Sequence, residues 1–170
     1  MKKWIVSAPL AMLTFPCIAT AQSKEALIGT WKLVSATDTT ERGVIRDTFG
    51  PNPTGFLTYT ADGRMMGIIS NGGRKPLSTI DYTAAPVEER AEAFVTFGAY
   101  AGTYTLEKGR VIHHVQAAWL ENWVGTDQIR TIVKLEGDEL ILRASSASSG
   151  GATVTTVLVW QRWKAGPIGH

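Results

Sequence analysis

The chain has 170 residues, with 17 Lys or Arg against 15 Asp or Glu, 44% apolar side chains and one cysteine, which suits a single packed domain. A charged fraction of 19%, together with six Trp, four Tyr and five Phe, excludes an intrinsically disordered chain. A mean hydropathy of zero excludes a polytopic membrane protein.

Residues 1–21 have the three parts of a secretory signal peptide. Lys2 and Lys3 form a positive start, residues 4–15 are mostly apolar, and Ala19-Thr20-Ala21 is an A-x-A cleavage site. A membrane anchor would need about 20 uninterrupted apolar residues, and this run is shorter and contains proline. We therefore predict cleavage after Ala21 and a periplasmic or secreted domain over residues 22–170.

The alternative of a lipoprotein depends on Cys17, which lies within this leader. The residues before it, Thr14-Phe15-Pro16, do not match a lipobox, because Phe and Pro stand where small residues are needed. Removal of the leader takes away Lys2, Lys3 and the cysteine, which leaves 15 basic and 15 acidic residues. The mature chain is then neutral and free of thiols, so its stability must come from a core without disulfides.

The mature sequence consists mostly of short runs of β-branched and aromatic residues between glycine-containing turns. This pattern predicts an all-β fold, a single antiparallel up-and-down barrel of about 8–10 strands. Between residues 70 and 100 the pattern changes, and an acidic first turn followed by apolar residues at helical spacing predicts one short helix over 86–97. The helix could cap the barrel mouth as a mobile lid or pack against a sheet edge. Strands are expected at 29–37, 44–49, 55–60, 64–70, 101–107, 110–120, 128–136, 139–145 and 153–163.

Three tight turns predict the register of neighbouring strands. Asp62-Gly63, Lys108-Gly109 and Gly137-Asp138 each fit a two-residue hairpin loop. Because side chains alternate across a strand, each hairpin then presents one apolar face to the interior. The inward pairs expected from these turns are Tyr59 with Met66, Leu57 with Ile68, Leu106 with Val111, Tyr104 with His113, Gly102 with Val115, Leu135 with Leu140 and Val133 with Leu142.

Several segments along residues 27–163 resemble a known family. They are Gly29-Thr30-Trp31-Lys32-Leu33-Val34-Ser35, Gly55-Phe56-Leu57-Thr58-Tyr59-Thr60-Ala61-Asp62-Gly63-Arg64-Met65, Ala101-Gly102-Thr103-Tyr104, His113-His114-Val115 and Asn122-Trp123-Val124-Gly125-Thr126. Together they are similar to the bacterial lipocalin-like domain family, of calycin type. The resemblance implies an arginine of the last strand, Arg162, packed over Trp31 at the base of the barrel. It implies an apolar internal cavity but no particular ligand, since the barrel hosts carriers and enzymes alike.

The sequence offers no support for a metal, a cofactor or a nucleic acid. Only three histidines occur, and His113 and His114 are adjacent, so a regular strand points them to opposite faces. Phosphate-binding and dinucleotide-binding motifs are absent. A neutral mature chain also lacks the basic surface that nucleic-acid binding requires. We expect no metal, no cofactor, no nucleic-acid partner and no membrane span, and a monomer or weak homodimer.

The expected inner face combines apolar side chains with a few polar ones, which is typical of a ligand site. We predict a pocket for a small hydrophobic or aromatic molecule, while by register Arg130 falls outside it. Trp119 and Trp123 either frame its entrance or fold back on their loop. The alternative is a cofactor-free isomerase, cyclase or lyase with His113 as base and Tyr104 as acid; a third is a ligand-free structural protein. The predicted lining is Tyr59, Met66, Tyr104, His113, Trp119, Trp123, Val133 and Leu142.

Overall fold

The computed structural model describes residues 23–147 and 152–164. The predicted signal peptide at 1–21, with Cys17, lies outside the described residues. Within them the chain forms nine strands and two α-helices, and all nine predicted strands occur. The strands are β1 (Gly29–Thr40), β2 (Ile45–Asp47), β3 (Thr54–Tyr59), β4 (Arg64–Ser70), β5 (Phe97–Glu107), β6 (Arg110–Ala118), β7 (Asp127–Glu136), β8 (Glu139–Ala147) and β9 (Thr153–Arg162).

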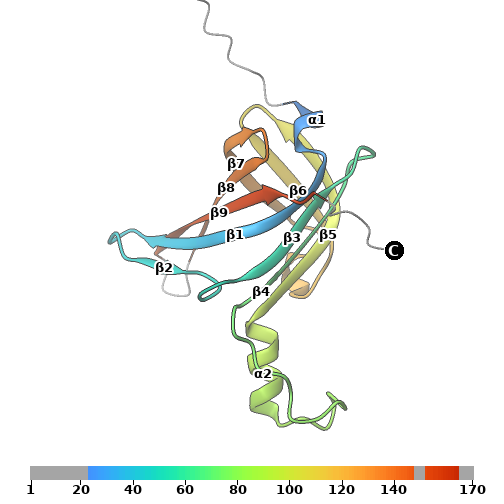
Figure 1. The fold of residues 1–170 in the computed structure, drawn as a ribbon, viewed down its shortest axis with the longest axis vertical. Helices are drawn as coiled ribbons and strands as arrows, with labels where there is room; N and C mark the ends of the chain where they lie inside the picture. The colour runs from blue at the N-terminus through green and yellow to red at the C-terminus, as the bar shows by residue number, and fades with distance from the viewer. Residues whose placement is uncertain (1–22, 148–151, 165–170) are drawn as a thin grey trace, which may run out of the picture.

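Eight of these strands close into an antiparallel barrel (Figure 1). Each strand from β3 to β8 pairs with the next one in sequence, and β1 closes the barrel by pairing with both β3 and β9. The three-residue β2 adds only to the far half of β1. The predicted up-and-down barrel is therefore confirmed, and closure removes the exposed edges that an open sheet would have.

The two ends of the barrel differ (Figure 1). One end, here the α1 end, carries the short helix α1 (Lys24–Leu27) and the turns that join β3 to β4, β5 to β6 and β7 to β8. The other, the α2 end, carries the helix α2 (Val87–Val95) and the β6–β7 loop with a short 3₁₀ helix, η1 (Glu121–Trp123). The helix α1 was not among the elements expected from the sequence.

At the α1 end, Arg162 holds α1 and Trp31 together. Its guanidinium lies 4.1 Å from the centroid of the Trp31 ring, and it donates hydrogen bonds to the carbonyls of Ile28 and Ala26 at 2.8 and 2.7 Å. The Trp31 indole N–H donates to the Leu27 carbonyl at 2.9 Å. Gly29 is required beside them, because its φ is +131° and a Cβ there would lie 2.7 Å from Arg162. The predicted contact between Trp31 and Arg162 is confirmed.

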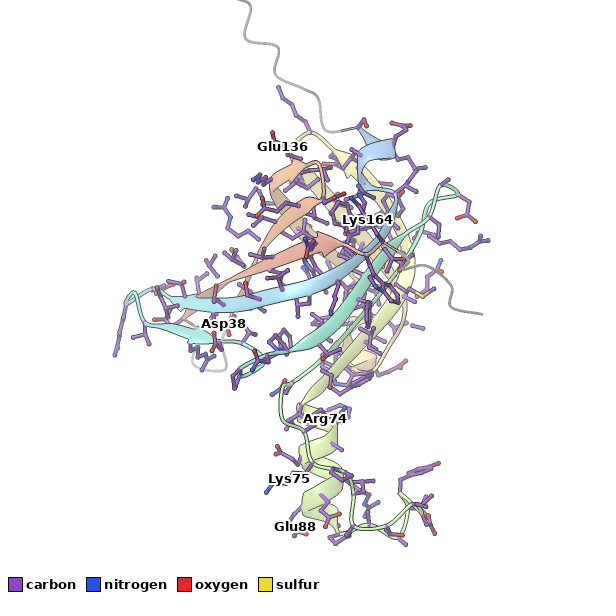
Figure 2. The ribbon with its side chains drawn as sticks, viewed as in Figure 1. Asp38, Arg74, Lys75, Glu88, Glu136 and Lys164 are labelled. Atoms are coloured by element: carbon purple, nitrogen blue, oxygen red, sulfur yellow. The ribbon has the colours of Figure 1, made fainter. Side chains whose placement is uncertain are left out.

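Helix α2 occupies most of the predicted range 86–97 and projects away from the barrel (Figure 1). Arg74 links it to the sheet, where the helix meets the barrel (Figure 2). The Arg74 guanidinium donates to Thr96 Oγ1 at 3.0 Å and to the Ala93 carbonyl at 3.0 Å, and it also reaches Ser70 Oγ at 3.3 Å. No residue of α2 itself is buried. The helix therefore does not plug the barrel interior.

The predicted register of the β3–β4 hairpin is wrong by one residue. Thr60 donates its N–H to the Arg64 carbonyl at 2.9 Å, so the loop has three residues and ends at Gly63 with φ +88°. Tyr59 consequently pairs with Met65, which is buried, whereas Met66 faces outward and is 58% exposed. Ile68 also faces outward instead of pairing with Leu57. Met66 is therefore not part of the interior.

The β7–β8 hairpin starts in the predicted register and then loses it. Leu135 pairs with Leu140 as expected, but a bulge between Ile132 and Lys134 leaves Val133 unpaired. Ile132 then pairs with Leu142, and Val133 is 54% exposed. The extra residue exchanges the two faces of β7 on one side of the bulge. Val133 is therefore outside the interior, contrary to the prediction.

The β5–β6 hairpin has the predicted register. Leu106 pairs with Val111, Tyr104 with His113, and Gly102 with Val115. His113 is buried, and His114 lies on the opposite face, where it contacts Asp127 and Thr105. No helix of the described segments is long and apolar enough to cross a membrane.

Candidate functional site

A cavity of about 300 Å³ lies inside the barrel toward the α2 end. Its walls come from most strands of the barrel, and Val95 at the end of α2 and Trp123 of η1 complete them. The α1 end is filled with side chains instead, among them Trp31, Tyr59, Met65, Val111 and Leu140, each at most 2% exposed. The interior is therefore packed at one end and hollow at the other.

Aromatic rings form one side of the cavity. Trp119 and Trp123 meet edge to face with their centroids 5.0 Å apart, and Trp123 meets Tyr100 at 5.5 Å. Phe94 of α2 lies 6.2 Å from Trp119. Edge-to-face pairs of this kind stabilise each other beyond their buried area. Both predicted tryptophans thus line the cavity, and the loop that carries them folds onto the barrel.

His113 lies at the floor of the cavity between two tyrosines. Its Nε2 is 2.7 Å from the hydroxyl of Tyr59, and its Nδ1 is 2.7 Å from the hydroxyl of Tyr100. The imidazole is 1% exposed. Both ring nitrogens are therefore satisfied inside the protein, as a buried histidine requires.

Burial controls the protonation of this triad. Burial, followed by the charges of Arg130 and His114, lowers the pKa of His113 to about 3. Burial raises the pKa of Tyr100, and it raises that of Tyr59 well above the ordinary value. All three groups are thus neutral near neutral pH, and an imidazole with so low a pKa is a weak base.

Arg130 also lines the cavity. It pairs across β6 and β7 with Val111, whose side chain is fully buried, so the pairing turns Arg130 inward. The cavity lining contains no Asp or Glu among the described residues. Asp127, three residues earlier on β7, has its carboxylate 2.7 Å from His114 Nδ1 instead. The structure thus places a cation inside the cavity without a carboxylate.

The predicted site residues fall into three groups. His113, Trp119, Trp123 and Leu142 line the cavity. Tyr59 lies behind His113 in the packed region, while Met66 and Val133 are on the outer surface. Tyr104 is buried, but its hydroxyl donates to the Thr60 carbonyl at 2.9 Å and the residue is outside the described cavity lining. The Tyr104 hydroxyl is therefore hydrogen-bonded away from His113, and the two side chains do not share the cavity.

Sequence reasoning missed Tyr100 and Arg130. The predicted strand began at Ala101, whereas β5 begins at Phe97. Continuing the alternation from Tyr104 by four residues would have placed Tyr100 inside. For Arg130 no such signal exists, because its orientation follows from the bulge at Val133.

All three buried side-chain polar atoms that lack a partner within the described chain belong to cavity-lining residues. They are Thr48 Oγ1, Trp119 Nε1 and Trp160 Nε1. Two of them are N–H groups, which can only donate. Over the same residues, no cluster of three or more His, Cys, Asp or Glu side chains is placed to hold a metal ion. Two of these three unpartnered groups of the cavity lining are therefore hydrogen-bond donors only.

Comparisons with known proteins give one family match and several distant structural similarities. The family described as a lipocalin-like domain matches residues 28–163. No curated protein matches the chain. Similar solved structures include bovine odorant binding protein with its natural ligand, at 13% identity and a TM-score of 0.44, covering 86% of this chain and 77% of that one. Another is a redesigned β-barrel, at 13% identity and a TM-score of 0.41, covering 85% of this chain and 98% of that one.

Proposed function

Because the chain belongs to the lipocalin-like domain family, we propose that it binds a small hydrophobic or aromatic molecule inside the barrel. The observation that carries the proposal is the cavity of about 300 Å³ at the α2 end. This volume is at the lower limit of pockets that hold small molecules. The ligand should accordingly be small.

The composition of the wall supports an apolar or aromatic body for the ligand. Trp119, Trp123 and Tyr100 provide ring faces and edges, and Leu57, Ile69, Leu142 and Leu158 provide aliphatic surface. Water in such a space makes few hydrogen bonds, so an apolar ligand that displaces it gains free energy. The few polar groups at the floor would fix the orientation of the ligand.

The proposal is tested with the neutral fluorescent probe N-phenyl-1-naphthylamine. The probe should bind the purified chain at one site with increased fluorescence. Native mass spectrometry of the protein from its host should show a small ligand that is lost on denaturation. A chain that binds no probe and retains no ligand would contradict the proposal.

A matched pair of variants locates the binding. Ala144 lines the cavity on β8, so Ala144→Phe fills part of it and should weaken probe binding at least about tenfold. Arg143, the preceding residue, faces outward, and Arg143→Phe adds the same ring to the outer face without effect on binding. Thermal unfolding confirms that both variants are folded. Equal binding by the two variants would place the probe elsewhere.

We also infer from residues 1–21 that the protein is exported and cleaved after Ala21, and that the mature domain is a monomer or weak homodimer. The positive start, the apolar stretch and the A-x-A site support export. The intact mass of the protein from its host should correspond to residues 22–170. A mass that includes the leader, or a lipid attached to Cys17, would contradict this.

A further inference from the structure

Arg130 is the first of two groups that point to a particular ligand chemistry. Its guanidinium carries five N–H donors, and its partners among the described residues are the carbonyl of Ile129, at 3.0 Å, and the hydroxyl oxygen of Tyr100. A charge beside apolar walls is costly unless a counterion or hydrogen-bond acceptors compensate it. The described cavity lining contains no carboxylate that could serve as the counterion. Donors of Arg130 are thus available to a ligand.

The second group is the hydroxyl of Tyr100, and the direction of its hydrogen follows from the hydrogen bonds of Tyr59 and His113. Its hydroxyl is fully buried, and its one partner within the described chain is His113 Nε2. A buried hydroxyl hydrogen needs an acceptor, so Tyr59 donates to Nε2. Nε2 then carries no hydrogen, and the neutral imidazole holds its proton on Nδ1.

The orientation of Tyr100 follows from that tautomer. His113 Nδ1–H donates to the Tyr100 oxygen over 2.7 Å, so the hydrogen of the Tyr100 hydroxyl cannot point toward His113. The described residues offer it no other acceptor within hydrogen-bond distance. Tyr100 lines the cavity. Its O–H is therefore free to donate to a ligand there, as Arg130 is.

Resting on the proposed function, we infer that the ligand is a small monocarboxylic acid with an apolar or aromatic body, whose carboxylate accepts hydrogen bonds from Arg130 and Tyr100. The guanidinium fork matches the two oxygens of a carboxylate and neutralises its charge. The rings of Trp119 and Trp123 enclose the apolar body. Tyr59 is a positioning residue, because it acts through His113 on the direction of the Tyr100 hydrogen.

A competition experiment separates this inference from the proposed function. N-phenyl-1-naphthylamine is displaced by 4-phenylbutanoate or by the matched alcohol 4-phenyl-1-butanol at about pH 7.5, where the acid is ionised. The acid should displace the probe at a concentration at least about tenfold lower, since a charged hydrogen bond in a desolvated site is worth that much. Equal competition by acid and alcohol would overturn the inference and leave apolar binding intact. Failure of the probe itself to bind would overturn both.

Two methionine variants assign the preference to Arg130. Arg130→Met should abolish the preference for the acid, measured as the ratio of the acid and alcohol concentrations that displace the probe. Arg143→Met removes an arginine from the outer face of the adjacent strand and should retain the wild-type preference. Tyr100→Phe, which removes only the hydroxyl, should reduce the preference by about three- to tenfold. A preference for the acid that survives in Arg130→Met would overturn the inference.

Nitrogen NMR tests the positioning role of Tyr59 directly. In the wild-type chain, the ¹⁵N shifts of His113 should identify the neutral tautomer with hydrogen on Nδ1. In Tyr59→Phe the two tautomers should mix, and the preference for the acid should fall by a few fold while the probe still binds. A wild-type His113 with hydrogen on Nε2 would overturn the assigned direction of the Tyr100 donor.

Discussion

The two ends of the barrel are built from the same strands, yet they differ in packing. Leu140 and Leu142 are two residues apart on β8 and both point inward, but Leu140 is enclosed by the packed α1 end and Leu142 borders the cavity. Trp31 and Trp119 differ in the same way. Trp31 has its N–H bonded to Leu27, whereas Trp119 lines the cavity and its N–H has no partner among the described residues. Side chains are thus tightly packed at the α1 end and leave a cavity at the α2 end.

One arginine at each end of the barrel illustrates the difference. Arg162 at the α1 end stacks on Trp31 and caps two carbonyls of the α1 region. Arg130 at the α2 end bonds one neighbouring carbonyl and has no carboxylate beside it in the described cavity lining. A satisfied group contributes to stability, while an unsatisfied one is available to a ligand. The α1 end therefore holds the fold, and the α2 end is suited to binding.

The largest expected effect is acid destabilisation through His113. Its pKa falls from 6.5 to about 3 on folding, so below pH 6.5 the unfolded chain binds a proton that the folded chain does not. Stability from the neutral imidazole is complete above pH 6.5 and decreases by about 1.4 kcal/mol per pH unit as pH falls, to a loss of about 4–5 kcal/mol near pH 3.

Urea unfolding between about pH 7.5 and pH 4.5 measures this effect. His113→Gln lacks the titrating group, so the stability difference between wild type and variant should shrink as pH falls. Parallel curves for the two proteins would contradict the assigned burial of a neutral His113.

The next effect compares the two leucines of β8. Leu140→Ala should lower the free energy of unfolding by about 3–4 kcal/mol, because it leaves a void in packed surroundings. Leu142→Ala should cost about 2 kcal/mol, since its side chain already borders empty space and loses fewer contacts. Chemical denaturation of both variants gives the comparison. Equal losses would mean that the α2 end is as tightly packed as the α1 end.

Replacing either arginine with methionine should change the stability by no more than Leu142→Ala does, and only Arg162→Met should be clearly destabilising. Arg162→Met should cost about 2 kcal/mol, because it removes a cation–π contact and two hydrogen bonds to carbonyls. Arg130→Met should change the stability by less than about 0.5 kcal/mol or increase it, since an uncompensated charge is replaced by an apolar chain. Thermal melts of the two variants measure both changes in stability. A strong destabilisation by Arg130→Met would give that residue a structural role.

The smallest effect concerns helix α2. Arg74→Ala removes the hydrogen bonds to Thr96 and Ala93 that link the helix to the barrel. Because no residue of α2 is buried, the amides of the helix should exchange with deuterium several-fold faster, while global stability changes by less than about 1 kcal/mol. Unchanged exchange in 87–95 would mean that other contacts hold the helix.

The outline of the barrel could be predicted from sequence, but its interior only in part. Gly29-Thr30-Trp31 and Arg162 predicted the contact between Trp31 and Arg162 at the α1 end. The Lys108-Gly109 turn predicted the register of β5 and β6. The β3–β4 register failed because Met65-Met66 and Ile68-Ile69 are pairs of identical residues. Either face of β4 is then equally apolar, and the pattern could not correct an error of one residue in the turn.

Two neighbouring residues of similar character are also the reason why the inward position of Arg130 could not be predicted. Ile132 and Val133 are both β-branched and apolar, so the sequence does not show which one is bulged. That one residue determines whether Arg130 faces the cavity or the solvent. A bulge is set by the fit of neighbouring strands around the closed barrel, and a single strand's pattern contains no record of it.

The tryptophan indole signals test the central claim, that the α2 end binds a ligand and the α1 end does not. Uniformly ¹⁵N-labelled protein is titrated with N-phenyl-1-naphthylamine while the indole N–H resonances are followed. Trp119 and Trp123 line the cavity, whereas Trp31 is sealed at the α1 end and Trp163 lies outside. We predict saturable shifts for Trp119 and Trp123 and none for Trp31 and Trp163. Shifts at Trp31 or Trp163 alone, or no shift at all, would contradict the account.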